Sequence, residues 1–147
     1  MSQSKPACAI WGKAHRVAVL YRVDAEILSK TEAGLYYRDL FWKHNPELIQ
    51  IYIVNNPDKY DDFLAVVDMF VPALEALVDG HGDSIRLTAE QIEAVEAELD
   101  WLFSVASPAF QQDIVKEQTR WPLSEFVGMT MTEVWEYVNT RWTPDEP

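Results

Sequence analysis

Residues 56–79 read NPDKYDDFLAVVDMFVPALEALVD, and this stretch decides the fold class. Asn56 is a good helix-capping residue, Pro57 suits the first helical position, and aspartates follow in the first turns. Apolar residues then recur every three or four positions, which is the spacing of one helix face. The stretch therefore predicts an amphipathic helix over 57–79. Pro72 lies inside it, and we expect a kink or a break there because proline removes a backbone donor.

Three further helix starts follow downstream. Thr88 and Thr130 each stand three residues before a Gln or Glu, which is the capping-box pattern. Ser107 stands directly before a proline and can cap a helix in the same way. Because an apolar stripe continues from each start, the sequence predicts one helix after each of them.

Upstream, the helical pattern is ambiguous at one segment. Residues 13–29 and 31–42 each carry apolar side chains at helical spacing. Residues 49–54, IQIYIV, contain branched side chains that also suit a strand. Because Asn45 and Pro46 just before them resemble a helix start, we predict a helix there, with a strand as the alternative.

The composition agrees with a single folded domain. The chain has 147 residues, and 48% of them are hydrophobic, which excludes wholesale disorder. We predict an all-α fold, a single compact irregular bundle of six to seven helices over residues 1–147. Helices 57–79 and 88–106 are expected to form its central antiparallel hairpin. Short flexible ends are expected at about 1–10 and 143–147.

The sequence carries no recognisable targeting signal. The apolar stretch 7–11 is shorter than a signal-peptide core, and no stretch approaches the roughly 20 apolar residues of a membrane span. Ser2 stands where myristoylation requires glycine. A single cysteine, Cys8, cannot build an internal disulfide framework and fits a reducing compartment. We therefore expect a cytoplasmic protein.

Negative charge is concentrated in the middle of the chain. The net charge is −12; residues 1–56 carry seven basic and five acidic side chains, whereas 57–147 carry five and nineteen. Residues 58–100 alone hold twelve acids against two cations. Such a field repels nucleic-acid phosphates and anionic lipid, and it accelerates encounter with a basic partner. We expect no direct nucleic-acid or membrane binding.

Motifs for catalysis or metal binding are not found. The loop 79–90 has acidic residues at positions 1, 5 and 12 of a calcium-binding loop, but Ser84 replaces the required glycine and Arg86 an apolar residue. The three histidines lack ligand-spaced partners, and there is no nucleophile elbow or phosphate-binding glycine loop. We expect no metal, no cofactor and no enzymatic activity. A small carboxylate-based enzyme is an alternative that no motif supports.

Acidic and aromatic residues supply the candidate partner-binding set. One acidic row recurs every seven residues and lies opposite the apolar stripe, and a second lies on the next helix at spacings of three and four. The two rows are expected to be exposed. Tryptophans near the chain ends or charged segments are candidate interface anchors, whereas Trp135 is expected in the core. The full set is Asp61, Asp68, Glu75, Glu93, Glu96, Asp100, Trp11, Trp42 and Trp142.

Two functional hypotheses follow. The first is a non-enzymatic inhibitor or regulator, like an immunity protein, an antitoxin or a phage-encoded inhibitor, that covers a basic and nucleic-acid-binding surface of a protein partner. The alternative is an assembly subunit or chaperone that binds through apolar and aromatic grooves. The run 121–135, WPLSEFVGMTMTEVW, is similar in pattern to small phage-encoded helical proteins, including tail-assembly chaperones. This resemblance assigns no functional residue.

Overall fold

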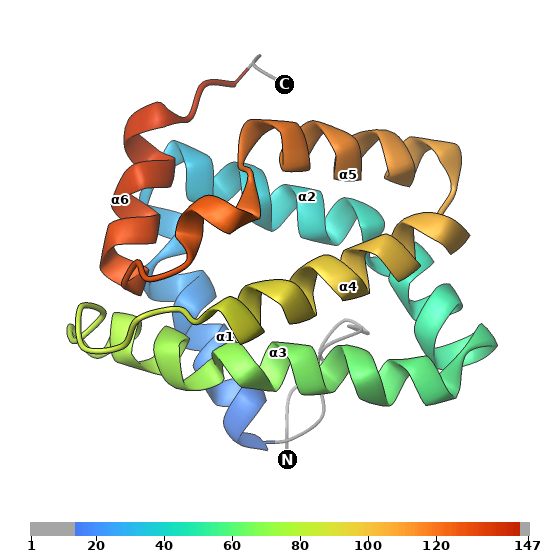
Figure 1. Cartoon of the computed structure of the whole chain (residues 1–147), viewed down its shortest axis with the longest axis horizontal. Helices are drawn as coiled ribbons and strands as arrows, with labels where there is room; N and C mark the ends of the chain where they lie inside the picture. The colour runs from blue at the N-terminus through green and yellow to red at the C-terminus, as the bar shows by residue number, and fades with distance from the viewer. Residues whose placement is uncertain (1–13, 145–147) are drawn as a thin grey trace.

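The computed structural model describes residues 14–144, and this part of the chain is all-α (Figure 1). Its six α-helices are α1 (Ala14–Glu26), α2 (Glu32–Leu48), α3 (Pro57–Val78), α4 (Ala89–Val105), α5 (Pro108–Arg120) and α6 (Met131–Arg141). Three short elements are the 3-10 helix η1 (Leu28–Lys30), the π-helix η2 (Ile49–Asn55) and the 3-10 helix η3 (Leu123–Phe126). Within the described range, the only β-type pairing is an isolated bridge between Arg86 and Thr130.

The predicted helix starts are confirmed, and three of them have the expected capping hydrogen bonds; α3 begins after Asn56, whose side chain instead donates to the Ile51 carbonyl. Thr88 and Thr130 each form a complete capping box at the start of α4 and α6. The Ser107 hydroxyl accepts from the Phe110 backbone N–H, and α5 begins at the next residue. These starts are set by contacts within four residues, so they can be predicted from local sequence.

The predicted helix start at Asn45-Pro46 is wrong, and the break allowed for at Pro72 is absent. Asn45-Pro46 does not start a helix, because α2 continues through Pro46 and runs into η2. The segment 49–54 is therefore helical as predicted, but it continues the preceding helix. Pro72 does not break α3, which is continuous over 22 residues. Its ring is exposed on the outer face of the helix and faces solvent.

The hairpin of α3 and α4 is the structural centre of the bundle. The two helices run antiparallel and contact one another, and α1 packs against α3 (Figure 1). Helices α2 and α5 run antiparallel on the other side of α4, and α6 closes one end. The Gly-rich loop after α3 contains Gly80 at φ +84°, a left-handed conformation that glycine adopts without strain. Among residues 14–144, no helix is long and apolar enough to cross a bilayer.

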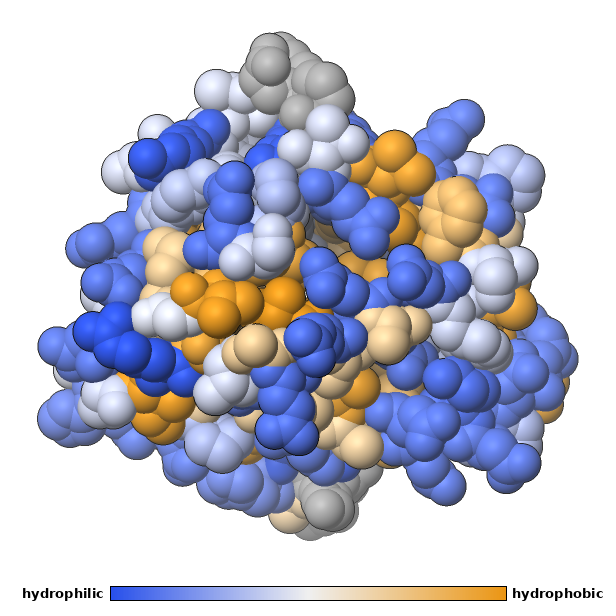
Figure 2. All heavy atoms as spheres, in the orientation of Figure 1, coloured by the Kyte–Doolittle hydropathy of each residue, from blue (hydrophilic) through white to orange (hydrophobic). Residues whose placement is uncertain are grey.

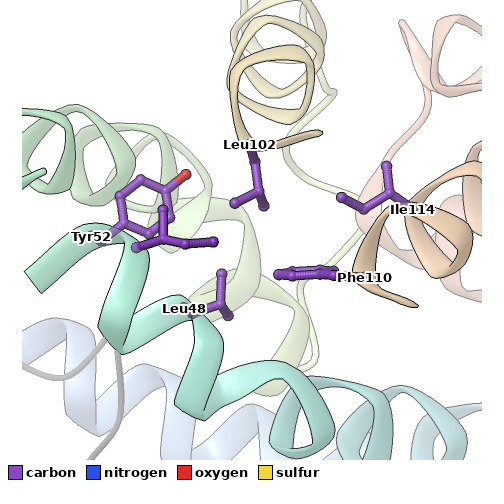
Figure 3. Packing of buried hydrophobic residues seen from close by; sticks show 6 residues of the cluster. Leu48, Tyr52, Leu102, Phe110 and Ile114 are labelled. Atoms are coloured by element: carbon purple, nitrogen blue, oxygen red, sulfur yellow. The ribbon is translucent and has the colours of Figure 1, made fainter. Parts of the chain in front are cut away.

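Two apolar clusters form the core. In the first, side chains from α2, η2, α4 and α5 point toward one another (Figure 3); its members are Leu48, Ile51, Tyr52, Leu102, Phe110 and Ile114. The second lies around α6 and η3; its buried members are Ala33, Leu87, Ile92, Trp121, Phe126 and Val138. Trp135, predicted in the core, packs against this second cluster and is half-buried, so it lies at the edge of the core.

Candidate functional site

The predicted acidic row on α3 does not lie wholly in solvent. The Asp68 carboxylate accepts two hydrogen bonds of 2.8 Å from the Arg16 guanidinium on α1. Arg16 itself is only 3% exposed. The hydrogen bond with Asp68 raises the pKa of Arg16, although burial acts in the opposite direction. Asp68 is therefore only partly exposed, with 32% of its side chain accessible, and its carboxylate balances a buried cation.

The same side of α3 continues to face α1 toward its end. The Glu75 carboxylate lies 3.3 Å from the His15 ring and is half-exposed. Asp79, one turn further, forms a 2.7 Å ion pair with Arg22. α1 therefore packs along the C-terminal part of α3, from Asp68 to Asp79.

Three of the four remaining acids of the predicted rows face solvent. Asp61, Glu93 and Asp100 are exposed, and Glu96 is half-buried. Asp58 and Glu90, which the prediction omitted, are exposed on the same two helices. No described cation lies within ion-pair distance of any of these six carboxylates. We call this set the hairpin acids: Asp58, Asp61, Glu90, Glu93, Glu96 and Asp100.

The register of the hairpin brings several of these acids to one end. The Lys59 ammonium lies 3.4 Å from the buried Glu98 carboxylate and 4.8 Å from the centre of the Trp101 ring. The first turn of α3 therefore lies beside the C-terminal half of α4. Consequently Asp58 and Asp61 share this end of the hairpin with Asp100.

The cations nearest to the hairpin are engaged with other acids. Lys59 binds Glu98 and lies 3.7 Å from Asp62. Arg22 pairs with Asp79 and Glu26, and Arg86 lies 3.6 Å from Glu133. Among residues 14–144, no cation neutralises the hairpin acids, so their negative field persists and is weakened by salt.

The three predicted interface tryptophans differ in their surroundings. Trp42 is 38% exposed on α2 and meets the Phe41 ring edge-to-face at 5.4 Å. Trp142 is half-buried beside Tyr36, and its indole N–H has no hydrogen-bond partner among residues 14–144. Trp142 thus packs on the second core cluster. Trp11 lies outside the described residues, as do residues 1–10 and 145–147 of the predicted flexible ends.

A polar seam between α2 and α5 was not predicted. At one end, the Glu47 carboxylate accepts from the Ser107 backbone N–H at 2.6 Å and from its hydroxyl at 2.7 Å. In the middle, the Asp113 carboxylate lies 2.8 Å from the Lys43 ammonium and 2.7 Å from the His44 ring. We call this set of contacts, with the tyrosine contacts described next, the α2–α5 seam.

At the other end of the seam, two tyrosine hydroxyl groups bind one carboxylate. Tyr36 and Tyr37 donate to the two oxygens of Glu117 at 2.9 and 2.6 Å. The Trp121 indole N–H donates to the Tyr37 hydroxyl. Burial, and then the hydrogen bond to Glu117, raise the pKa of Tyr36 to about 12 and raise the pKa of Tyr37 as well.

For Asp113, in contrast to the two tyrosines, the pKa is lowered. Burial alone would raise the pKa of its carboxyl group. The hydrogen bonds from Lys43 and His44 outweigh this effect, so the Asp113 pKa lies below its ordinary value. Asp113 is therefore ionised at neutral pH, and each of the three seam carboxylates accepts hydrogen bonds from neighbouring donors.

A cavity of about 480 Å³ lies between the seam and the hairpin. Its walls come from α2, α3, α4, α5 and η3. They consist of Tyr37, Leu40, Phe41, His44, Leu48, Phe63, Val67, Leu99, Leu102, Phe110, Asp113, Ile114, Glu117, Gln118, Trp121, Leu123 and Phe126. Figure 2, in the orientation of Figure 1, shows apolar atoms at the middle of this face with hydrophilic side chains around them.

Titratable groups are not clustered as a metal site in the described structure. Residues 14–144 contain no group of three or more His, Cys, Asp or Glu side chains that could hold a metal ion. In the loop after α3, the Ser84 hydroxyl donates to the His81 carbonyl, and Asp79 pairs with Arg22. The candidate sites are thus the hairpin acids and the cavity.

Comparison with protein-family models, with curated proteins and with solved structures finds no significant match to this chain.

Proposed function

We propose that this protein is a non-enzymatic regulator that covers a basic surface of a protein partner with the outer face of its α3–α4 hairpin. The observation that supports this most strongly is the set of hairpin acids, which lie on two adjacent helices with no described cation to neutralise them. In this proposal the partner's surface is one that otherwise holds nucleic acid. The complex forms in the cytoplasm, as immunity-, antitoxin- and phage-inhibitor-type proteins do.

The physical basis is charge spacing on a rigid scaffold. Glu93 and Asp100 are seven residues apart on α4, which corresponds to about 10.5 Å along the helix axis. The Lys59–Glu98 contact fixes the register of the two helices, so Asp61 lies at the same end of the hairpin as Asp100. Carboxylates held in this way present a negative surface to cationic side chains that normally contact phosphates. Such an array accelerates association and favours basic partners over acidic ones.

The proposal is tested by a triple variant and a charge-matched control. The test variant is Asp61→Asn, Glu93→Gln and Asp100→Asn. The control variant is Glu32→Gln, Asp39→Asn and Glu136→Gln, which removes three exposed charges from α2 and α6. Each protein is immobilised and used to capture partners from a lysate of the producing cells at about 0.05 M and about 0.5 M salt, where screening differs strongly.

We expect the wild type and the control to retain the same nucleic-acid-binding proteins at low salt and to release them at high salt. The test variant should lose them at both salt concentrations, and added DNA or RNA should compete with the wild type. Equal capture by the test variant and the control, with both folded by circular dichroism, contradicts the proposal.

The second candidate is an assembly subunit or chaperone, and the exposed apolar side chains favour it. Leu35 and Trp42 are exposed seven residues apart on α2. Ile53 and Val54 are exposed on η2. An interface of this kind responds little to salt, so capture that persists at about 0.5 M salt and is lost on Trp42→Ala supports this candidate instead.

A further inference from the structure

We propose that the cavity between the α2–α5 seam and the hairpin is a binding site for an uncharged aromatic small molecule. Its volume of about 480 Å³ lies within the range of roughly 300–1,000 Å³ that ligand pockets occupy. This inference is independent of the hairpin acids, because none of them lines the cavity.

Side chains that should fill the core remain partly accessible around this cavity. Phe63 and Val67 lie on the apolar stripe of α3, and Leu99 lies on that of α4, yet all three are only half-buried. Leu40 and Phe41 on α2 are half-buried in the same way. An apolar ligand in the cavity would supply the contacts that these side chains lack.

The lining indicates an aromatic ligand. Six aromatic rings contribute to the walls, from α2, α3, α5 and η3: Tyr37, Phe41, Phe63, Phe110, Trp121 and Phe126. Aromatic rings gain from edge-to-face and offset stacking in addition to burial. The hydrogen bonds of Tyr37 and Trp121 and the stacking of His44 on Phe110 at 4.1 Å already fix several walls. The site is therefore largely formed before a ligand enters.

The polar part of the lining indicates an uncharged ligand with one hydrogen-bonding group. Asp113 and Glu117 are carboxylates already bound to donors of the seam, so they repel an anion and need no ligand to satisfy them. The Gln118 side chain lines the cavity, and its amide has no hydrogen-bond partner among the described residues. It can therefore donate to, or accept from, one polar group of the ligand.

Two fluorescent probes test the site. N-phenyl-1-naphthylamine is uncharged and aromatic, and 8-anilinonaphthalene-1-sulfonate has the same ring system with an added sulfonate. We expect one molecule of the uncharged probe to bind per chain. The bound probe should quench the fluorescence of Trp121 or accept excitation energy from it. The sulfonate should bind about ten-fold more weakly or worse, because the two wall carboxylates repel it.

Cavity-filling variants separate this site from surface binding. Val67→Phe adds a ring inside the cavity, and Leu40→Phe does so from α2, so that one of them serves if the other fails to fold. Val115→Phe is the matched control, because Val115 is exposed on α5 and does not line the cavity. The filling variants should raise the melting temperature and lower the affinity for the uncharged probe at least about ten-fold. The control should bind the probe as the wild type does.

Three results would overturn the inference. The first is no binding of the uncharged probe to the wild-type protein. The second is unchanged affinity in a folded filling variant, which would assign the probe to an exposed apolar patch. The third is equal affinity for the two probes, which would contradict the assignment to an uncharged ligand.

Discussion

Asp61 and Asp68 lie two turns apart on α3, yet they have different neighbours. Asp68 holds the buried Arg16 through two hydrogen bonds of 2.8 Å. Asp61 is exposed and has no described cation beside it. Removing one partner of a buried pair leaves an uncompensated charge, whereas a surface change of this kind has little effect on stability.

We therefore expect Asp68→Ala to lower the free energy of unfolding by about 3 kcal/mol. Asp61→Ala should change it by less than about 0.5 kcal/mol. Urea titration followed by circular dichroism measures both values. Equal values for the two variants would mean that Arg16 finds another partner and that Asp68 belongs with the exposed acids after all.

Tyr52 and Glu98 form a second buried contact between η2 and α4. Tyr52 is fully buried, and its hydroxyl donates to the Glu98 carboxylate at 2.5 Å. Tyr52→Phe leaves that buried carboxylate with one donor fewer, so we expect a loss of about 1–3 kcal/mol. The double variant Tyr52→Phe/Glu98→Met should recover part of this loss, because it leaves no buried acceptor unsatisfied. Chemical denaturation of the three proteins tests this, and additive losses would contradict it.

At the scale of elements, local signals could be predicted and contacts between distant elements could not. The capping residues Thr88, Ser107 and Thr130 act within their own first turn, and each start is confirmed. Asn45-Pro46 has the same local pattern, but α2 continues through it because the residues that follow pack in the core. Here tertiary packing overrides the local signal for a helix start. Local sequence alone does not reveal such an override.

The candidate sites follow the same division. Helical periodicity separates the apolar side of α3 from its polar side, but it does not show which polar residues meet α1. For that reason the periodicity predicts Asp68 in solvent, although it binds Arg16 of α1. The seam joins Tyr37 to Glu117 and Glu47 to Ser107, which are 80 and 60 residues apart in the chain. Neither this seam nor the cavity beneath it leaves a pattern in the sequence.

Pro72 provides a test of how α3 tolerates proline. Its ring is exposed, so little packing is lost when it is replaced. Pro72→Ala restores a backbone N–H in the helix interior and should raise the free energy of unfolding by about 1–3 kcal/mol. Thermal and urea unfolding measure the gain. An unchanged or lower stability would show that the bundle needs the backbone geometry that proline imposes on α3.

The seam predicts a response to alkaline pH. The folded protein holds the Tyr36 proton up to about pH 12, whereas the unfolded chain releases it near the ordinary value of 10. The stability that this proton provides is complete below pH 10 and is lost as the pH rises toward 12. Between pH 9 and pH 11, the melting temperature of the wild type should therefore fall more than that of Tyr36→Phe. Parallel curves for the two proteins would contradict the assigned pKa.

At the scale of the whole molecule, several cations of the described residues are paired with carboxylates of other segments, whereas the hairpin acids are not. Arg16, Arg38 and Lys43 each bind a carboxylate of another segment. The hairpin acids have no such partner in the described structure and repel one another. Neutralising them should leave the helix content unchanged and the melting temperature equal or slightly higher, because self-repulsion falls. A clear loss of stability would show that these acids serve the fold.

The central claim is that the hairpin acids guide a basic partner to this surface. It is tested most directly by the association rate constant of the captured partner, measured at about 0.05 M and about 0.5 M salt. For the variant Asp61→Asn, Glu93→Gln and Asp100→Asn, we predict a rate about ten-fold lower than wild type at low salt and a much smaller difference at high salt. Dissociation should change less. If this variant associates at the wild-type rate at both salt concentrations, the hairpin is not the docking surface.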